Sequence, residues 1–161
     1  MKILFIQTGG TIDKDYPRKQ GGYAFEFGEA AMKRILAKLD TQIEFEIITA
    51  FQKDSLDITA EDRQNLVKII EGREEKRIII THGTDTLIES AQYLERQVKN
   101  RSIILTGAMR PERFSNSDAD INLGMALAAV QLLHEGVYIC IQALVRQASL
   151  IKRDKESGSF Y

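Results

Sequence analysis

The sequence predicts an α/β fold, with a doubly wound, mostly parallel sheet and helices on both of its faces. Short apolar runs alternate along the chain with longer stretches whose apolar residues recur at helical spacing. Several short runs are apolar at almost every position, which is typical of strands buried on both faces of a parallel sheet. The 161 residues suit one domain with a full hydrophobic core, so we expect a single domain over residues 1–161.

The apolar runs are expected to form five strands joined by right-handed crossovers. A polar, basic segment, 146–161, follows the last run and is expected to be a loop or arm. The expected strands cover residues 3–6, 45–48, 78–80, 103–105 and 137–141.

Four helices are expected between these strands, and three of them carry start or stop signals. Thr59 with Asp62 marks one start. Thr86 with Glu89 has the pattern of a capping box. Gly136 is expected to close the longest helix. The apolar helical positions begin near residues 31, 66, 87 and 121.

Composition excludes several classes of function. The net charge is −1, and basic residues are dispersed, so we expect no nucleic-acid partner. No run approaches the ~18 apolar residues of a membrane span, so we expect no membrane partner and a cytoplasmic protein. Cys140 lies in an apolar run and is expected to be a buried thiol. With His82 and His134 it makes no convincing zinc site, so we expect no metal and no cofactor.

Polar loops follow four of the expected strands. Ligands of doubly wound sheets bind outside the carboxyl ends of the strands, so these loops should meet at one rim. Three of the loops are rich in threonine. The loops cover residues 8–11, 54–57, 81–86 and 106–111.

The first loop, Thr8-Gly9-Gly10-Thr11, allows three interpretations. Paired glycines let backbone N–H groups approach a ligand, and a threonine at such a turn can act as a nucleophile. The loop can equally be a tight turn whose hydroxyls cap the backbone. Phosphate binding is the third interpretation, but the loop matches neither the dinucleotide fingerprint nor the P-loop.

The third loop offers a hydroxyl beside a carboxylate at an expected helix start. Thr84 can act as a nucleophile or shuttle a proton, and Asp85 can bind a substrate ammonium group. The alternative is a helix cap by Thr84 or Thr86, with Asp85 favoured by the helix dipole. His82 can be a general base, but a hydrogen-bonded structural histidine is the more common case at a strand end.

The remaining two loops carry weaker signals. Ser55 can hold a small polar ligand or can belong to a turn with an N-cap. Arg110 stands in a loop closed by proline, which indicates a structural strand exit, although its guanidinium can pair with a carboxylate.

Three of these blocks together resemble the N-terminal domain of the bacterial-type L-asparaginases. They are Thr8-Gly9-Gly10-Thr11-Ile12, His82-Gly83-Thr84-Asp85-Thr86 and Gly107-Ala108-Met109-Arg110-Pro111, and the resemblance covers nearly the whole chain. The family implies a doubly wound α/β domain that hydrolyses asparagine, often glutamine too, without metal or cofactor. It also has a second, smaller domain, so the chain looks like the short, single-domain asparaginase-like proteins.

The resemblance implies a role for each matching residue. Thr11 corresponds to the nucleophile, and Thr84 and Asp85 correspond to the second catalytic threonine and its neighbour. Ser55 falls where the family holds the substrate α-carboxylate, and Asp85 is also the partner of the α-ammonium. The residues implied in substrate binding are Gly10, Ser55, Gly83, Thr84 and Asp85.

The chain departs from the family pattern at three places. The family lysine that pairs with the second threonine and the aspartate aligns with Arg153, and Lys152 takes its place after a shift of one residue. The mobile tyrosine of the first loop aligns with Phe25, with Tyr16 and Tyr23 nearby. Leu56 replaces a residue that is polar in many relatives.

Three hypotheses follow. The first is an amidohydrolase in which Thr11, Thr84, Asp85 and Lys152 or Arg153 release ammonia from asparagine or a related small amide. The second is a weakened asparaginase-like domain that binds an amino acid or acts as a subunit. The third is a flavodoxin-like module with phosphate or flavin in the first loop. A homodimer or higher homo-oligomer is expected because the family assembles in this way.

Overall fold

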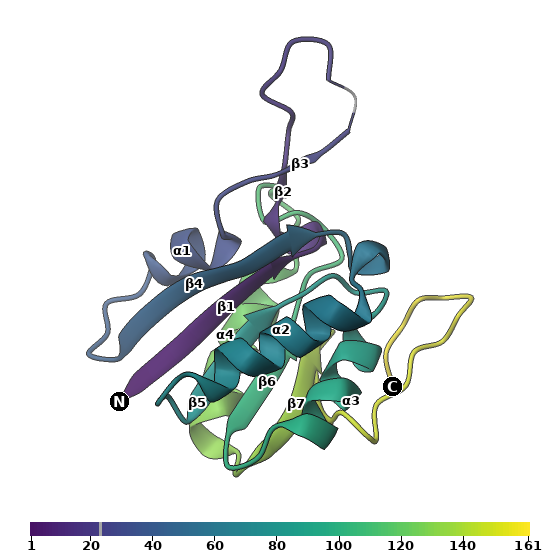
Figure 1. The fold of residues 1–161 in the computed structure, drawn as a ribbon. Helices are drawn as coiled ribbons and strands as arrows, with labels where there is room; N and C mark the ends of the chain where they lie inside the picture. The colour runs from purple at the N-terminus through teal and green to yellow at the C-terminus, as the bar shows by residue number, and fades with distance from the viewer. Residues whose placement is uncertain (23) are drawn as a thin grey trace.

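Six strands form one sheet in the order β4-β1-β5-β6-β7-β8 (Figure 1). The computed structural model describes residues 1–22 and 24–161. All neighbouring strands are parallel except β7 and β8, so the mostly parallel sheet is confirmed. The strands are β1 (Lys2–Gly9), β4 (Glu44–Lys53), β5 (Arg77–Thr81), β6 (Ser102–Thr106), β7 (Gly136–Ile141) and β8 (Leu144–Gln147).

Helices cover both faces of this sheet, as predicted. Residues of α2 and α3 pack on one face with Ile78 and Ile80, and residues of α1 and α4 pack on the other with Ile79 (Figure 1). Successive β5 side chains therefore enter different cores, which explains why the run is apolar at every position. The helices are α1 (Ala31–Leu36), α2 (Ala60–Glu71), α3 (Leu87–Gln97) and α4 (Ala119–Leu132).

The order of the strands reverses beside β1, which creates a topological switch point. From β1 the chain passes to β4 on one side, and then crosses to β5 on the other side. The loops after these three strands consequently meet at one rim, where ligands of doubly wound sheets bind. They include two short 3-10 helices, η1 (Thr11–Asp13) and η2 (Ser55–Asp57). A small ribbon, β2 (Lys14–Asp15) with β3 (Glu26–Phe27), also rises from this rim (Figure 1).

One expected start signal is confirmed and two other helix signals are wrong. Thr59 and Asp62 form the reciprocal capping box of α2. Thr86 precedes α3 but makes no cap, because its hydroxyl donates to the backbone oxygen of Ser55 at 2.7 Å. Gly136 begins β7, and α4 ends four residues earlier, at Leu132, with Leu133 as its C-cap.

The segment after β7 is more structured than the expected loop or arm. The strand β8 pairs antiparallel with β7 at the sheet edge. Gln142 and Ala143 connect the two strands with φ values of 49° and 62°, the conformation of a type I′ hairpin turn. Such turns usually contain Asn-Gly, so nothing in this dipeptide signals one. Further on, Arg153 and Phe160 form an antiparallel bridge that folds the C-terminal residues back on themselves.

Over the described part of the chain, no helix is both long enough and apolar enough to cross a membrane.

Candidate functional site

The first and third loops touch through their glycines. Gly10 has a φ of +84°, and a Cβ atom placed there would lie 2.3 Å from the backbone nitrogen of Gly83. No side chain fits in so small a space. The absence of side chains at Gly10 and Gly83 therefore brings the backbones that carry Thr11 and Thr84 into contact.

Ser55 joins the second loop to the same place. A Cβ atom on Gly83 would lie 2.6 Å from the Cβ of Ser55, so these loops are also in contact. The serine hydroxyl accepts from the backbone N–H of Asp85 at 3.2 Å. The side chain of Ser55 is 2% exposed, which fixes its hydroxyl beside the start of α3.

The two threonines of the first loop differ in their hydrogen bonds. The Thr8 hydroxyl is buried and donates to the backbone oxygen of Thr81 at 2.7 Å, so Thr8 has a structural role. Thr11 begins η1 and is half-buried. Within residues 1–22 and 24–161, nothing hydrogen-bonds its hydroxyl. Of the two, only Thr11 has a hydroxyl available for chemistry.

Arg153 supplies the cation beside Asp85. Its Nη1 donates to the Asp85 carboxylate at 2.9 Å and to the backbone oxygen of Thr84 at 3.0 Å. The guanidinium also lies over the Phe160 ring, 5.2 Å from its centroid, which fixes its orientation. Lys152 is exposed, and its backbone pairs with the C-terminal residue. Of the two candidate cations, Arg153 contacts Asp85 and the Thr84 backbone, and among the described residues Lys152 makes neither contact.

A cavity of about 360 Å³ lies beside this ion pair. Asp85, Arg153 and Gly158 line it together with two further residues of the C-terminal segment, Asp154 and Lys155. Thr84 lies under the rim with 8% exposure. The cavity therefore opens on the charged side of the candidate site.

His82 is fully enclosed below the rim. Its Nδ1 lies 2.8 Å from the backbone oxygen of Gly83, so Nδ1 carries the proton. Burial lowers the pKa of this imidazole to about 4, which keeps it neutral. The geometry favours the structural role over the general base, because the unprotonated nitrogen, Nε2, is buried and contacts no hydrogen-bonding group of the described residues.

Asp13 is a residue of the site that the sequence motifs do not reveal. Its carboxylate accepts from the backbone N–H of Ala31 at 2.8 Å, and its backbone oxygen accepts from Gly28 at 3.0 Å. Burial raises the pKa of Asp13 to about 6. The side chains of Gln7 and Thr81 lie close enough to oppose this rise, although neither makes a well-formed hydrogen bond to the carboxylate. Two residues after Thr11, Asp13 thus anchors η1 to the start of α1.

The loop between β2 and β3 carries the candidate flap aromatics. Tyr16 and Phe25 pack on each other with ring centroids 5.3 Å apart, and both pack on Phe114, which follows the fourth loop. Tyr16 is nevertheless 67% exposed. Tyr23, the remaining candidate for the mobile tyrosine, lies outside the described residues.

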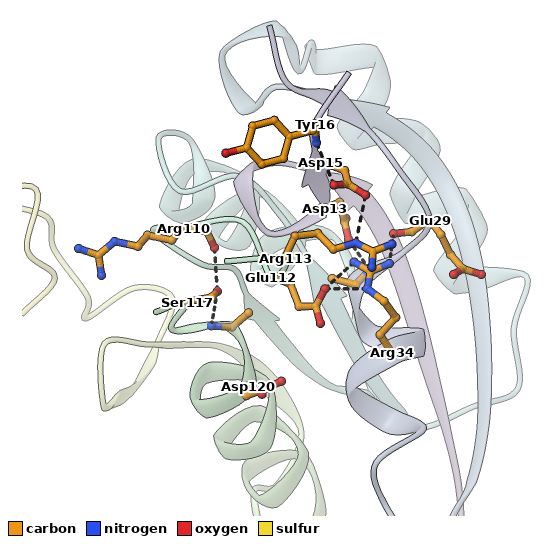
Figure 2. Close-up of polar contacts among 12 residues, drawn as sticks. Asp13, Asp15, Tyr16, Glu29, Arg34, Arg110, Glu112, Arg113, Ser117 and Asp120 are labelled. Atoms are coloured by element: carbon orange, nitrogen blue, oxygen red, sulfur yellow. Dashed lines mark hydrogen bonds and ion pairs between the residues drawn. The ribbon is translucent and has the colours of Figure 1, made fainter. Parts of the chain in front are cut away.

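Ion pairs hold β2 and α1 to the segment that follows the fourth loop. Arg113 contacts the carboxylate of Asp15 at 3.0 Å, and Arg34 of α1 contacts Glu112 at 2.6 Å (Figure 2). In Figure 2 Arg110 points away from this network, and its guanidinium donates only to the backbone oxygen of Asn116. Within the described residues Arg110 pairs with no carboxylate, which fits the structural role of its loop.

Cys140 is a buried free thiol, as predicted. Burial raises its pKa to about 12, so the thiol stays protonated. The described residues contain no cluster of three or more histidine, cysteine or acidic side chains with metal-binding geometry.

The family follows from a comparison with known proteins. Residues 2–158 match the family described as Asparaginase, N-terminal. The chain belongs to the asparaginase family. An L-asparaginase of Thermococcus kodakarensis is 31% identical over 163 residues, which cover 98% of this chain and 49% of that protein. The solved structure of the thermostable L-asparaginase from the same organism superposes with a TM-score of 0.88 and 27% identity, covering 100% of this chain and 51% of that one.

A second kind of relative also matches this asparaginase-family domain. A glutamyl-tRNA(Gln) amidotransferase subunit of Nanoarchaeum equitans is 36% identical over 124 residues, 74% of this chain and 31% of that protein. The chain thus spans about half the length of the curated relatives it matches, or less. Relatives of this asparaginase-family chain are named as an L-asparaginase and as an amidotransferase subunit.

Proposed function

We propose that this domain is an amidohydrolase that cleaves the side-chain amide of asparagine or a related small amide, with Thr11 as the nucleophile. The contact between Gly10 and Gly83 carries the proposal, because it brings together the backbones that precede Thr11 and Thr84. The asparaginase relatives support this substrate class.

The reaction needs two displacement steps at one carbonyl carbon. In the first, the Thr11 oxygen bonds to the amide carbon, the C–N bond breaks, and ammonia leaves. The proton lost by Thr11 reaches the leaving nitrogen through the Thr84 hydroxyl. In the second, water cleaves the resulting ester, returns a proton to Thr11 and releases the carboxylate product. Backbone N–H groups of the glycine-containing loops stabilise the oxyanion in both steps.

Different charged and polar groups of the site bind different parts of the substrate. Asp85 attracts an ammonium group of the substrate, and the Ser55 hydroxyl donates to a carboxylate. Arg153 forms an ion pair with Asp85 and holds its carboxylate in place. A guanidinium remains protonated at any working pH, so Arg153 stabilises negative charge but accepts no proton.

Ammonia release by Thr11→Ala and Thr84→Ala tests the proposal. Each variant should lose at least about 100-fold in turnover of asparagine, because a nucleophile or proton relay is removed. Thr41→Ala changes an exposed threonine far along the chain from the motifs and should retain full activity. Turnover that persists in Thr11→Ala at the wild-type rate would refute the assignment.

The amidotransferase relative and the arginine at position 153 favour a second candidate function. In that alternative the domain binds an amino acid, or serves as a subunit, with little turnover of its own. A ligand that binds only the folded state raises the melting temperature. Stabilisation by aspartate without ammonia release from any amide would therefore support the alternative over the hydrolase.

A further inference from the structure

A second cavity lies at the end of the sheet opposite the candidate site. It occupies about 280 Å³ beside the segments that lead into β5, β6 and β7. In Figure 1 the amino ends of the strands lie at the lower side of the view, and the β2–β3 ribbon rises from the upper side. This volume is just below the ~300–1,000 Å³ of drug-sized ligand sites, so it suits a smaller ligand. Its polar lining residues are Lys76, Arg77, Asn100, Ser102, His134 and Glu135.

The register of the sheet places two of these side chains on one face. Arg77 and Ser102 are partners in the parallel pairing of β5 with β6. Two residues further along their strands, Ile79 and Ile104 enter the core under α1 and α4, so Arg77 and Ser102 point to that same face. The chain leaves α4 over this face, and residues 133–135 close the cavity from above. Two strands and a helix end therefore fix its walls.

Polar groups at this cavity lack partners within the described chain. Ser102 is 6% exposed, and its hydroxyl is buried with no hydrogen-bond partner. The Nε atom of Arg77 is also buried and unpartnered. Buried polar groups are nearly always hydrogen-bonded, so a pair of such donors beside one cavity indicates that something else accepts from them.

The charges at this cavity are also unbalanced. On the same edge of the sheet Arg73 contacts Glu75 at 3.1 Å, but Lys76 and Arg77, which follow directly, form no ion pair among the described residues. Glu135 is the one carboxylate that lines the cavity within the described chain, and it pairs with neither cation. Two cations thus face one carboxylate, so the cavity attracts an anion.

We propose that this cavity binds a phosphate group, either as inorganic phosphate or at the end of a small phosphate ester. A phosphate ester carries a charge of about −1.5 to −2 at neutral pH and three acceptor oxygens, whereas a carboxylate has two oxygens and one charge. The hydroxyl, guanidinium and ammonium donors of this cavity match the larger set. Substrates of doubly wound sheets bind at the carboxyl ends of the strands, so a ligand at the amino ends stabilises the fold and does not react. The inference does not depend on the amidohydrolase proposal.

Calorimetric titration of the full chain with inorganic phosphate, in chloride of matched ionic strength, tests the site. The wild type should bind one equivalent, and Arg77→Met should weaken binding roughly tenfold or more, the effect of losing one charge-assisted hydrogen bond. Lys76→Met should also weaken binding, and because Lys76 is exposed this change does not disturb the start of β5. No saturable binding by the wild type, or wild-type affinity in both variants, would overturn the proposal.

Two control variants locate the bound phosphate. Arg96→Met removes an exposed arginine of α3 outside the cavity, and it should bind phosphate as the wild type does. Arg153→Met removes a cation of the candidate site and should also bind normally. Loss of binding in Arg153→Met, with binding kept in Arg77→Met, would place the anion at the opposite end of the sheet and contradict the proposal.

The source of the phosphate group follows from the same titration with adenosine monophosphate. Tighter binding than that of inorganic phosphate, by tenfold or more, would identify a phosphate ester as the ligand, and equal or weaker binding would identify free phosphate. Both results support the site when Arg77→Met weakens the binding of each probe. Probes that bind Arg77→Met and the wild type equally would exclude it.

Ser102→Ala gives a readout of stability that separates binding from folding. Its hydroxyl has no partner, so without phosphate the variant should be at least as stable as the wild type in urea. Phosphate also stabilises proteins in general because it is excluded from their surfaces, so the difference between the two proteins is what counts. Phosphate should raise the melting temperature of the wild type more than that of Ser102→Ala. Equal rises would mean that no phosphate binds at Ser102.

Discussion

At the scale of single residues, the ion pair with Asp85 distinguishes Arg153 from its neighbour Lys152. Arg153→Met removes the charge beside Asp85 and Thr84, so ammonia release should fall by roughly 100-fold, the size of effect seen when one preorganised donor is lost. Folding stability should change by less than about 1 kcal/mol, because Asp85 is half exposed. Lys152→Met is the control and should match the wild type in a turnover assay. Equal losses in both variants would contradict the placement of Arg153.

Asp13 should give the stability of the fold a distinct pH dependence. Its pKa rises from 3.8 to about 6 on folding, so the folded state holds the proton more tightly than the unfolded chain does. The contribution of this carboxyl group to the free energy of unfolding is fully present below about pH 4, and it is lost as the pH rises through about 6. Asp13→Asn should therefore be more stable than the wild type at pH 7.5, by an upper bound of about 3 kcal/mol, and equal to it near pH 4. Thermal unfolding across this range measures the difference; a variant that is less stable at pH 7.5 would contradict burial of the carboxylate as the cause.

At the scale of elements, the close approach of the first and third loops is the feature that assembles the site. Gly10→Ala should destabilise the fold by more than about 3 kcal/mol, because its Cβ would overlap the backbone of Gly83. Gly21→Ala is a matched control, since Gly21 also has a positive φ, +79°, but has nothing within 4 Å of its added Cβ. Gly21→Ala should lower the free energy of unfolding by only about 1–2 kcal/mol, which is the strain of the left-handed conformation. Urea unfolding of both variants compares the two; equal losses would mean that the loops do not constrain each other.

The observed elements also show which features of the fold sequence patterns can predict. The apolar runs predicted five strands because each strand places its side chains in one core or the other. The hairpin at Gln142 and Ala143 has no turn residues, so β8 could not be predicted from the sequence. Thr86 fits the capping-box pattern, but its hydroxyl goes to the neighbouring Ser55 loop, a tertiary contact that no local pattern encodes.

At the scale of the whole molecule, the sheet order explains how motifs far apart in sequence form one site. The sequence predicted which loops lie at the carboxyl ends of the strands, and crossing over β1 makes three of them neighbours. The sequence did not predict Asp13, because a lone aspartate after the threonine motif carries no signal. Its role becomes visible only from its contact with the backbone N–H of Ala31. Nor could the sequence decide between Lys152 and Arg153, since that choice depends on how the C-terminal segment folds back through Phe160.

The central claim is that the Thr11 oxygen forms a covalent bond with the substrate. Rapid quenching in acid during turnover of asparagine, followed by peptide mass analysis, tests it most directly. The peptide that contains Thr11 should carry the mass of one aspartyl group in ester linkage, and the same peptide from Thr11→Ala should carry none. An aspartyl group found on any other residue, or turnover with no covalent intermediate under conditions that trap a known acyl-enzyme, would contradict it.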